Sequence, residues 1–306
     1  MARIGSSMLA WAGWRMRVPE SWRPLRIEGE WRKGSIIVGD AAEAIMQVKW
    51  MRVTRKNFDA ARWARRRLKK VRRAPAAGGP SPKGFPDPAW APADPDAGRG
   101  AFWYGYAPAA GLLVGVLTSA GVSRKGQRAV ASTALPALRA SGRDDPTRWA
   151  VFGASFESPP GFAVRRRRVH LGDVALQLTA PGRSTLLLRQ VYPAALALAR
   201  RELPLWLEFP VFKEHRRFRP ADVQEAWRVE SFGRTLEGLR RQGRKQLPFP
   251  LGVCAPRWSE AAVVHDAELD RLLIVEYDAA GRADKDRVAR AIGAMNWAHF
   301  EPGGKR

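Results

Sequence analysis

The chain has 306 residues, a formal net charge of +24, 45% hydrophobic residues and 13 tryptophans. This apolar and aromatic content excludes a wholly disordered protein, and the length allows two modest hydrophobic cores. The single cysteine, Cys254, excludes an internal disulfide and a multi-cysteine zinc site.

The first residues have the alternating pattern of half-buried β-strands. Trp14, Met16 and Val18 would share one face, with arginines between them on the other. Similar strand-like segments follow at residues 25–31, 35–38 and 44–50, with a Gly39-Asp40 turn. We expect an antiparallel sheet.

A basic helix should follow, capped by Asn57 and ending near Arg73. Its apolar residues have helical spacing and would pack on the sheet. The basic residues that fall mostly away from that stripe are candidate polyanion-binding residues: Arg62, Arg65, Arg66, Lys69, Lys70 and Arg73. They could contact phosphates, or they could be the solvated face of a packed helix.

Residues 74–98 are rich in Pro, Gly and Ala, which predicts a loop or an extended linker. The uncharged stretch 100–123 is long enough to span a bilayer, but Pro108 and Gly111 interrupt it. We therefore expect a buried hairpin over 102–118. A weak helix near 127–140 and turn residues at 142–146 would close a first unit, residues 1–145.

The second unit, residues 146–306, repeats this order of elements. Its expected elements are strands at 149–156, 169–178 and 184–191, a helix at 194–207, an insertion at 208–256 with a polar helical segment at 233–242, a hairpin at 262–277 and a helix at 284–297. The fold class predicted from the sequence is α+β, with two similar units. Each would be an antiparallel sheet packed with helices in the order strands, helix, hairpin, helix.

The two units open alike. Trp14-Arg15-Met16-Arg17-Val18-Pro19-Glu20-Ser21-Trp22 and Ala154-Ser155-Phe156-Glu157-Ser158-Pro159-Pro160-Gly161-Phe162 each form a strand-like run that reaches proline and then an aromatic residue. With the elements that follow, this pattern resembles a tandem duplication of the PsbP-like/DcrB-like fold. The resemblance implies a non-catalytic protein that binds other proteins. It carries over no functional residues, because only fold-forming positions match.

Four consecutive arginines add a second group of candidates for polyanion binding: Arg165, Arg166, Arg167 and Arg168. Strand alternation would place two of them on each face of a sheet. They could form an anion site, or a positively charged edge that discourages aggregation.

No catalytic or metal-binding motif stands out. The four histidines, at positions 170, 215, 265 and 299, lack the spacing of metal ligands, and no glycine-rich loop could cradle a phosphate. The sequence therefore predicts a protein that is not an enzyme and has no metal or cofactor.

The positive charge is concentrated in residues 1–73, with about 19 basic and 6 acidic side chains. We expect a cytoplasmic adaptor-type protein that binds an acidic protein partner through a strongly basic surface. The alternative is a nucleic-acid-associated protein that binds the phosphate backbone through the 62–73 helix and the arginine clusters. A membrane partner is not expected.

Overall fold

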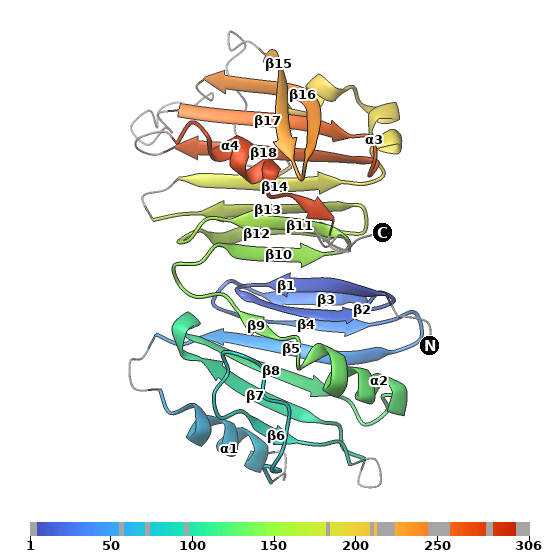
Figure 1. Ribbon diagram of the computed structural model, residues 1–306, viewed down its shortest axis with the longest axis vertical. Helices are drawn as coiled ribbons and strands as arrows, with labels where there is room; N and C mark the ends of the chain where they lie inside the picture. The colour runs from blue at the N-terminus through green and yellow to red at the C-terminus, as the bar shows by residue number, and fades with distance from the viewer. Residues whose placement is uncertain are drawn as a thin grey trace. The chain divides into compact units, whose positions relative to one another are not determined.

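The computed structural model describes residues 5–54, 58–70, 74–94, 98–181, 184–208, 211–212, 224–243, 258–279 and 284–297. The chain divides into two compact units, the first ending at Ser155 and the second running from Phe156 to Trp297 (Figure 1). Of the described residues, 49% lie in strands and 17% in helices. Three sheets built from antiparallel pairs therefore dominate the fold.

The α+β class predicted from the sequence is wrong, because segments expected to be helical are strands or short helices. Of residues 233–242, expected to be helical, Gly233 lies in a turn and the rest lie in strand β16 (Arg234–Gly243). Phe232 and Gly233 have φ angles of 50° and 75°. Two consecutive residues with positive φ form the tight turn of a β-hairpin, which pairs β16 with β15 (Gln224–Ser231) along its length.

Two other segments that were expected to form long helices contain only short ones. The helix expected at 127–140 is α2 (Arg124–Ala129) followed by a single π-helical turn at Val130–Ala134. The helix expected at 194–207 divides into α3 (Ala194–Arg200) and a 3-10 turn at Leu203–Trp206. Pro204 lacks the backbone N–H that a continuous helix needs, so the chain restarts as a tighter turn.

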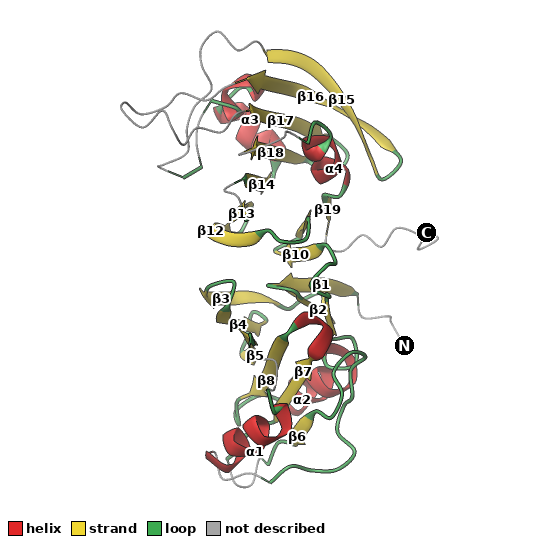
Figure 2. Cartoon of the chain, turned by 90° about the vertical axis from the view of Figure 1, so that its left-hand side faces the viewer, coloured by secondary structure: helices red, strands yellow, loops and turns green. Residues whose placement is uncertain are grey.

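In the first unit, one sheet has the order β3-β4-β5-β8-β7-β6. Its strands are β3 (Arg23–Gly29), β4 (Lys33–Gly39), β5 (Ala44–Arg52), β6 (Ala89–Ala91), β7 (Phe102–Ala107) and β8 (Leu112–Thr118). The hairpin predicted over 102–118 is confirmed, with Trp103 opposite Val116. Helix α1 (Ala60–Lys70) lies along β6 and β7 (Figures 1 and 2).

A second group of strands in this unit surrounds a tryptophan cluster. Four of the strands have the order β10-β1-β2-β9, and the unit boundary falls within β11. Their bounds are β1 (Ser6–Trp11), β2 (Trp14–Pro19), β9 (Arg139–Ala140), β10 (Thr147–Val151) and β11 (Ala154–Ser158). The rings of Trp11 and Trp31 lie 5.4 Å and 5.5 Å from that of Trp149. The Arg52 guanidinium lies 3.8 Å from the Trp31 ring centroid, and burial, with Arg143 nearby, lowers the pKa of Arg52 to about 10.

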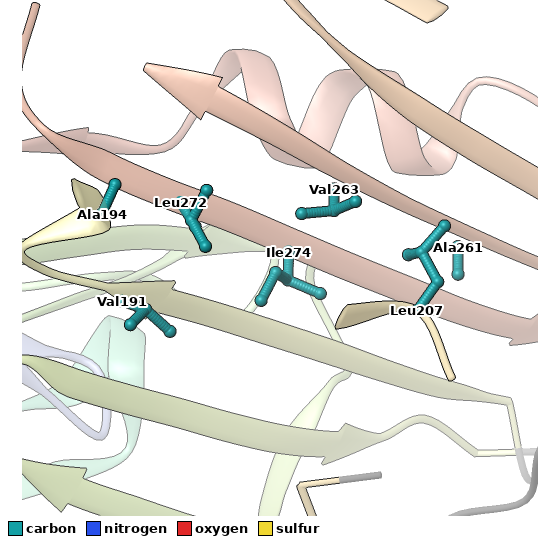
Figure 3. Packing of buried hydrophobic residues seen from close by; sticks show 7 residues of the cluster. All are labelled: Val191, Ala194, Leu207, Ala261, Val263, Leu272 and Ile274. Atoms are coloured by element: carbon teal, nitrogen blue, oxygen red, sulfur yellow. The ribbon is translucent and has the colours of Figure 1, made fainter. Parts of the chain in front are cut away.

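The second unit contains a seven-stranded sheet of order β12-β13-β14-β18-β17-β16-β15. The strands not yet given are β12 (Ala163–His170), β13 (Asp173–Thr179), β14 (Thr185–Val191), β17 (Trp258–Asp266) and β18 (Arg271–Ala279). One apolar cluster joins the start of α3 and the residue after the 3-10 turn to the sheet: Val191, Ala194, Leu207, Ala261, Val263, Leu272 and Ile274 (Figure 3). Ala261 and Val263 alternate on β17, and Leu272 and Ile274 alternate on β18. Val191 ends β14, Ala194 begins α3 and Leu207 follows the 3-10 turn.

Helix α4 (Arg287–Gly293) covers the opposite face of the same sheet (Figure 2). Its residues Val288, Ala291 and Ile292 are buried against β15, β17 and β18. A two-residue strand, β19 (Asn296–Trp297), follows it. The closing helix expected at 284–297 is therefore only seven residues long. Among the described residues, no helix has both the length and the apolar character needed to cross a membrane.

Candidate polyanion-binding surfaces

The start of α1 is fixed by the side chain of Asp59, whereas Asn57, the cap expected from the sequence, lies outside the described residues. The Asp59 carboxylate accepts a hydrogen bond from the backbone N–H of Arg62 at 2.7 Å. A negative charge at this position also suits the helix dipole. Ala64 and Leu68, four residues apart, are buried on the side that faces the sheet. The cap and the apolar stripe together set which side of α1 faces outward.

One flank of α1 is held by aromatic contacts. The Trp63 ring packs edge-on against Tyr104 of β7, with ring centroids 5.4 Å apart. The Arg67 guanidinium lies 5.0 Å from the Trp63 ring centroid, within the range of a cation–π contact. Burial raises the pKa of Tyr104, and the Arg67 charge opposes that rise. Arg67, which the sequence pattern did not single out, therefore belongs to this flank.

The outward side of α1 carries an exposed group of cations, here called the α1 basic face. It consists of Arg62, Arg65, Arg66, Lys69 and Lys70. Within the described residues, no carboxylate forms an ion pair with any of these five side chains. Arg62, Arg66 and Lys69 have the spacing i, i+4, i+7, which aligns them along one side of the helix. Arg73, the sixth predicted residue, lies outside the described residues.

The four consecutive arginines lie on β12, an edge strand of the seven-stranded sheet. Arg165 and Arg168 are exposed, whereas Arg166 and Arg167 are half-buried. The register with β13 shifts between Val164 and Arg166, so Arg165 occupies a β-bulge.

Part of the charge on β12 is neutralised within the unit. Arg168 Nε lies 3.3 Å from Asp173 Oδ2, and the same carboxylate accepts two hydrogen bonds from the buried Arg189, each 2.9 Å long. Arg166 and Arg167 also have interaction partners. The β12 arginines thus differ from the α1 basic face, which belongs to the other unit.

Four tryptophans in the segment from β2 to β5 do not form a stacking platform for bases. Trp14, Trp22 and Trp50 are buried, with relative exposures of 1%, 7% and 2%. Trp31 is half-buried and already covered by the Arg52 guanidinium. Base stacking needs an exposed ring face beside a basic groove, which these four rings do not offer.

Sequence reasoning missed two buried ionic groups in the second unit. Asp266, the last residue of β17, binds both Arg234 and Arg271, and Glu260 is an acid inside the apolar run of the same strand. A charged residue inside an apolar run was the available signal. Cys254, His215 and His299 lie outside the described residues. So does a further basic cluster of the sequence, formed by Lys213, Arg216, Arg217 and Arg219. Among the residues that are described, no three metal-binding side chains come together.

Comparison with known proteins gives no family or function. No protein-family model matches the chain, and no curated protein matches it. The α1 basic face must therefore be interpreted from its own chemistry.

Proposed function

We propose that the protein is a non-enzymatic, cytoplasmic binding protein of the adaptor type, and that the α1 basic face holds an acidic protein partner. One observation carries the proposal: five exposed cations lie on a helix whose opposite side is anchored by Ala64 and Leu68. A cation without an internal carboxylate partner remains available to an external one.

The arginines of this face favour a ligand with planar anionic groups. A guanidinium can bind a carboxylate through two parallel hydrogen bonds, whereas a lysine ammonium acts as a point charge. The net charge of +24 adds a long-range field that speeds encounter with an acidic partner. The partner expected from this chemistry exposes several Asp or Glu side chains.

Nucleic acid is the alternative ligand for the same face, because a guanidinium also binds phosphate. The aromatic contacts of α1 favour the protein partner. Trp63 packs on Tyr104 and is covered by Arg67, so its ring contributes to anchoring the helix. A surface that offers charge without an available ring binds single strands only through the backbone.

The test compares two triple variants of equal charge. Arg62→Gln, Arg66→Gln and Lys69→Gln remove the central line of the α1 basic face, and glutamine keeps good helix propensity. Arg23→Gln, Lys33→Gln and Lys49→Gln, all at exposed positions on β3, β4 and β5, form the matched control. Fluorescence anisotropy would follow binding to labelled poly-L-glutamate, and to short duplex and single-stranded DNA, across a salt series.

We expect the α1 variant to bind poly-L-glutamate on the order of tenfold more weakly than the wild type, because each exposed ion pair contributes about 0.2–1 kcal/mol. The control should retain most of the affinity. Equal weakening of both variants would contradict the assignment to α1. DNA binding that depends on α1 and exceeds polyglutamate binding at about 0.15 M salt would favour the nucleic-acid alternative.

A further inference from the structure

A carboxyl group is buried in the second unit on the face covered by α4. Glu260 of β17 has a relative exposure of 1% and lies opposite Tyr277 of β18, which has an exposure of 5%. Gln242 of β16 donates a hydrogen bond from Nε2 to Glu260 Oε1 at 3.2 Å. Within the described residues, Glu260 Oε2 has no hydrogen-bond partner.

The first turn of α4 lies over this pair. The Arg287 guanidinium is 5.9 Å from the ring centroids of both Tyr277 and Phe162. Arg287 Nη2 is held by Asp284 Oδ2 at 2.8 Å, so a carboxylate of the same segment already binds its charge. Asp286, the residue before α4, places a further negative charge near Glu260.

The other charged neighbours of Glu260 compensate it only weakly. Within the described residues, Arg240 of β16 forms an ion pair with Glu260, with Nη1 3.7 Å from Glu260 Oε1. The same guanidinium binds Glu225 of β15 at 2.6 Å, a much shorter contact. Among the described residues, an ionised Glu260 would therefore be a buried carboxylate with one neutral hydrogen-bond donor and one cation that it shares with Glu225. Such a charge is costly in a protein interior.

We propose that Glu260 is a proton-operated switch beneath α4. The neutral carboxyl allows the first turn of α4 to pack over β17 and β18. Loss of the proton to solvent leaves a buried charge that is relieved when α4 loosens and water reaches the site. The proton is the only species exchanged.

The direction of the pH effect follows from the neighbours of the carboxyl. Burial raises the pKa of Glu260; the Gln242 hydrogen bond and the Arg240 charge oppose the rise, while Asp286 and Glu225 add to it. A folded-state pKa above that of the unfolded chain means that the native state binds this proton more tightly. The charge penalty is absent below the unfolded-chain pKa of Glu260, grows as the pH rises above it, and is complete above the raised folded-state pKa.

Hydrogen–deuterium exchange of the α4 amides measures this loosening directly. Protection factors, corrected for the pH dependence of intrinsic exchange, would be compared between about pH 4 and pH 8 for the wild type and Glu260→Gln. Glutamine keeps the size of the side chain and cannot ionise. Glu237→Gln is the matched control, because Glu237 is an exposed acid on β16 of the same unit and pairs with Arg228.

In the wild type, we expect α4 protection to fall as the pH rises. Glu260→Gln should show a flat profile and about tenfold higher protection at neutral pH, because glutamine leaves no buried charge to be relieved by loosening. The switch would be overturned by parallel pH profiles in the two proteins, or by an equal gain in Glu237→Gln. A change of the same size in the β13 and β14 amides would also overturn it, since the effect would then belong to the whole sheet.

Discussion

Replacing Asp266 with alanine is expected to lower the free energy of unfolding of the second unit by about 3–5 kcal/mol, the usual cost of breaking a buried ion pair from one side. Asp266 and Arg271 have relative exposures of 1% and 0%. Arg271 Nε donates to Asp266 Oδ2 at 2.9 Å, and Arg234 donates to both oxygens of the same carboxylate at 2.9 Å and 3.0 Å. Without Asp266, Gln190 would be the remaining hydrogen-bond partner of the buried Arg271 guanidinium among the described residues.

The pKa of Arg271 also indicates that Asp266 compensates the buried guanidinium. Burial lowers it, and the hydrogen bond and charge of Asp266 oppose that fall. Removing the carboxylate removes this opposition and leaves the cost of desolvating the guanidinium. Asp266 also accepts a bond from the backbone N–H of Leu269, so the same substitution loosens the turn between β17 and β18.

Urea unfolding followed by circular dichroism measures the effect of Asp266→Ala. Glu268→Ala is the matched control, because Glu268 binds the same Arg234 at 3.0 Å but its side chain is 62% exposed. An exposed ion pair contributes about 0–1 kcal/mol, so the control should change stability little. Similar losses of unfolding free energy in the two variants would show that the buried Asp266–Arg271 pair stabilises the unit no more than an exposed pair does.

Trp149→Ala is expected to destabilise the first unit by about 3–5 kcal/mol, the range for removing a large aromatic side chain from a core. Trp149 has an exposure of 1% and contacts the rings of both Trp11 and Trp31. Its removal leaves a cavity and ends two aromatic contacts at once. Trp31, which lies between Trp149 and the Arg52 guanidinium, would lose support on one side.

Thermal unfolding of Trp149→Ala and Trp149→Phe would test this cluster. Phenylalanine retains an aromatic ring and most of the apolar area, so Trp149→Phe should lose clearly less stability than Trp149→Ala. Nearly equal melting temperatures for the wild type and the alanine variant would mean that the cluster contributes little to the stability of the unit.

Strand pairing explains why the helix predicted at residues 233–242 is a strand. The sequence of residues 233–242 predicts a polar helical segment. The hairpin turn at Phe232-Gly233 instead aligns this segment with β15, and β17 pairs along its other edge. Two neighbouring strands satisfy the backbone of β16 over most of its length, and this outweighs a weak local preference for helix.

The candidate sites likewise have features that the sequence predicts and features that depend on the tertiary fold. Consecutive basic residues and their helical spacing predicted the α1 basic face, and the buried stripe of Ala64 and Leu68 gives it its orientation. The partners of Glu260 could not be read from the sequence, because Gln242, Tyr277 and Asp286 come from three different elements. Only the register of the sheet and the docking of α4 bring them together.

The sequence by itself determined the features that depend on near neighbours along the chain: the period-two pattern of β2, the hairpin of β7 and β8, and the basic character of α1. Tertiary structure alone decided the β-rich class, the edge position of β12, and the burial of Glu260 and of the Asp266–Arg271 pair. The physical reason is that strand pairing joins residues far apart in the chain. A charged side chain is buried or exposed according to which distant strand lies beside it.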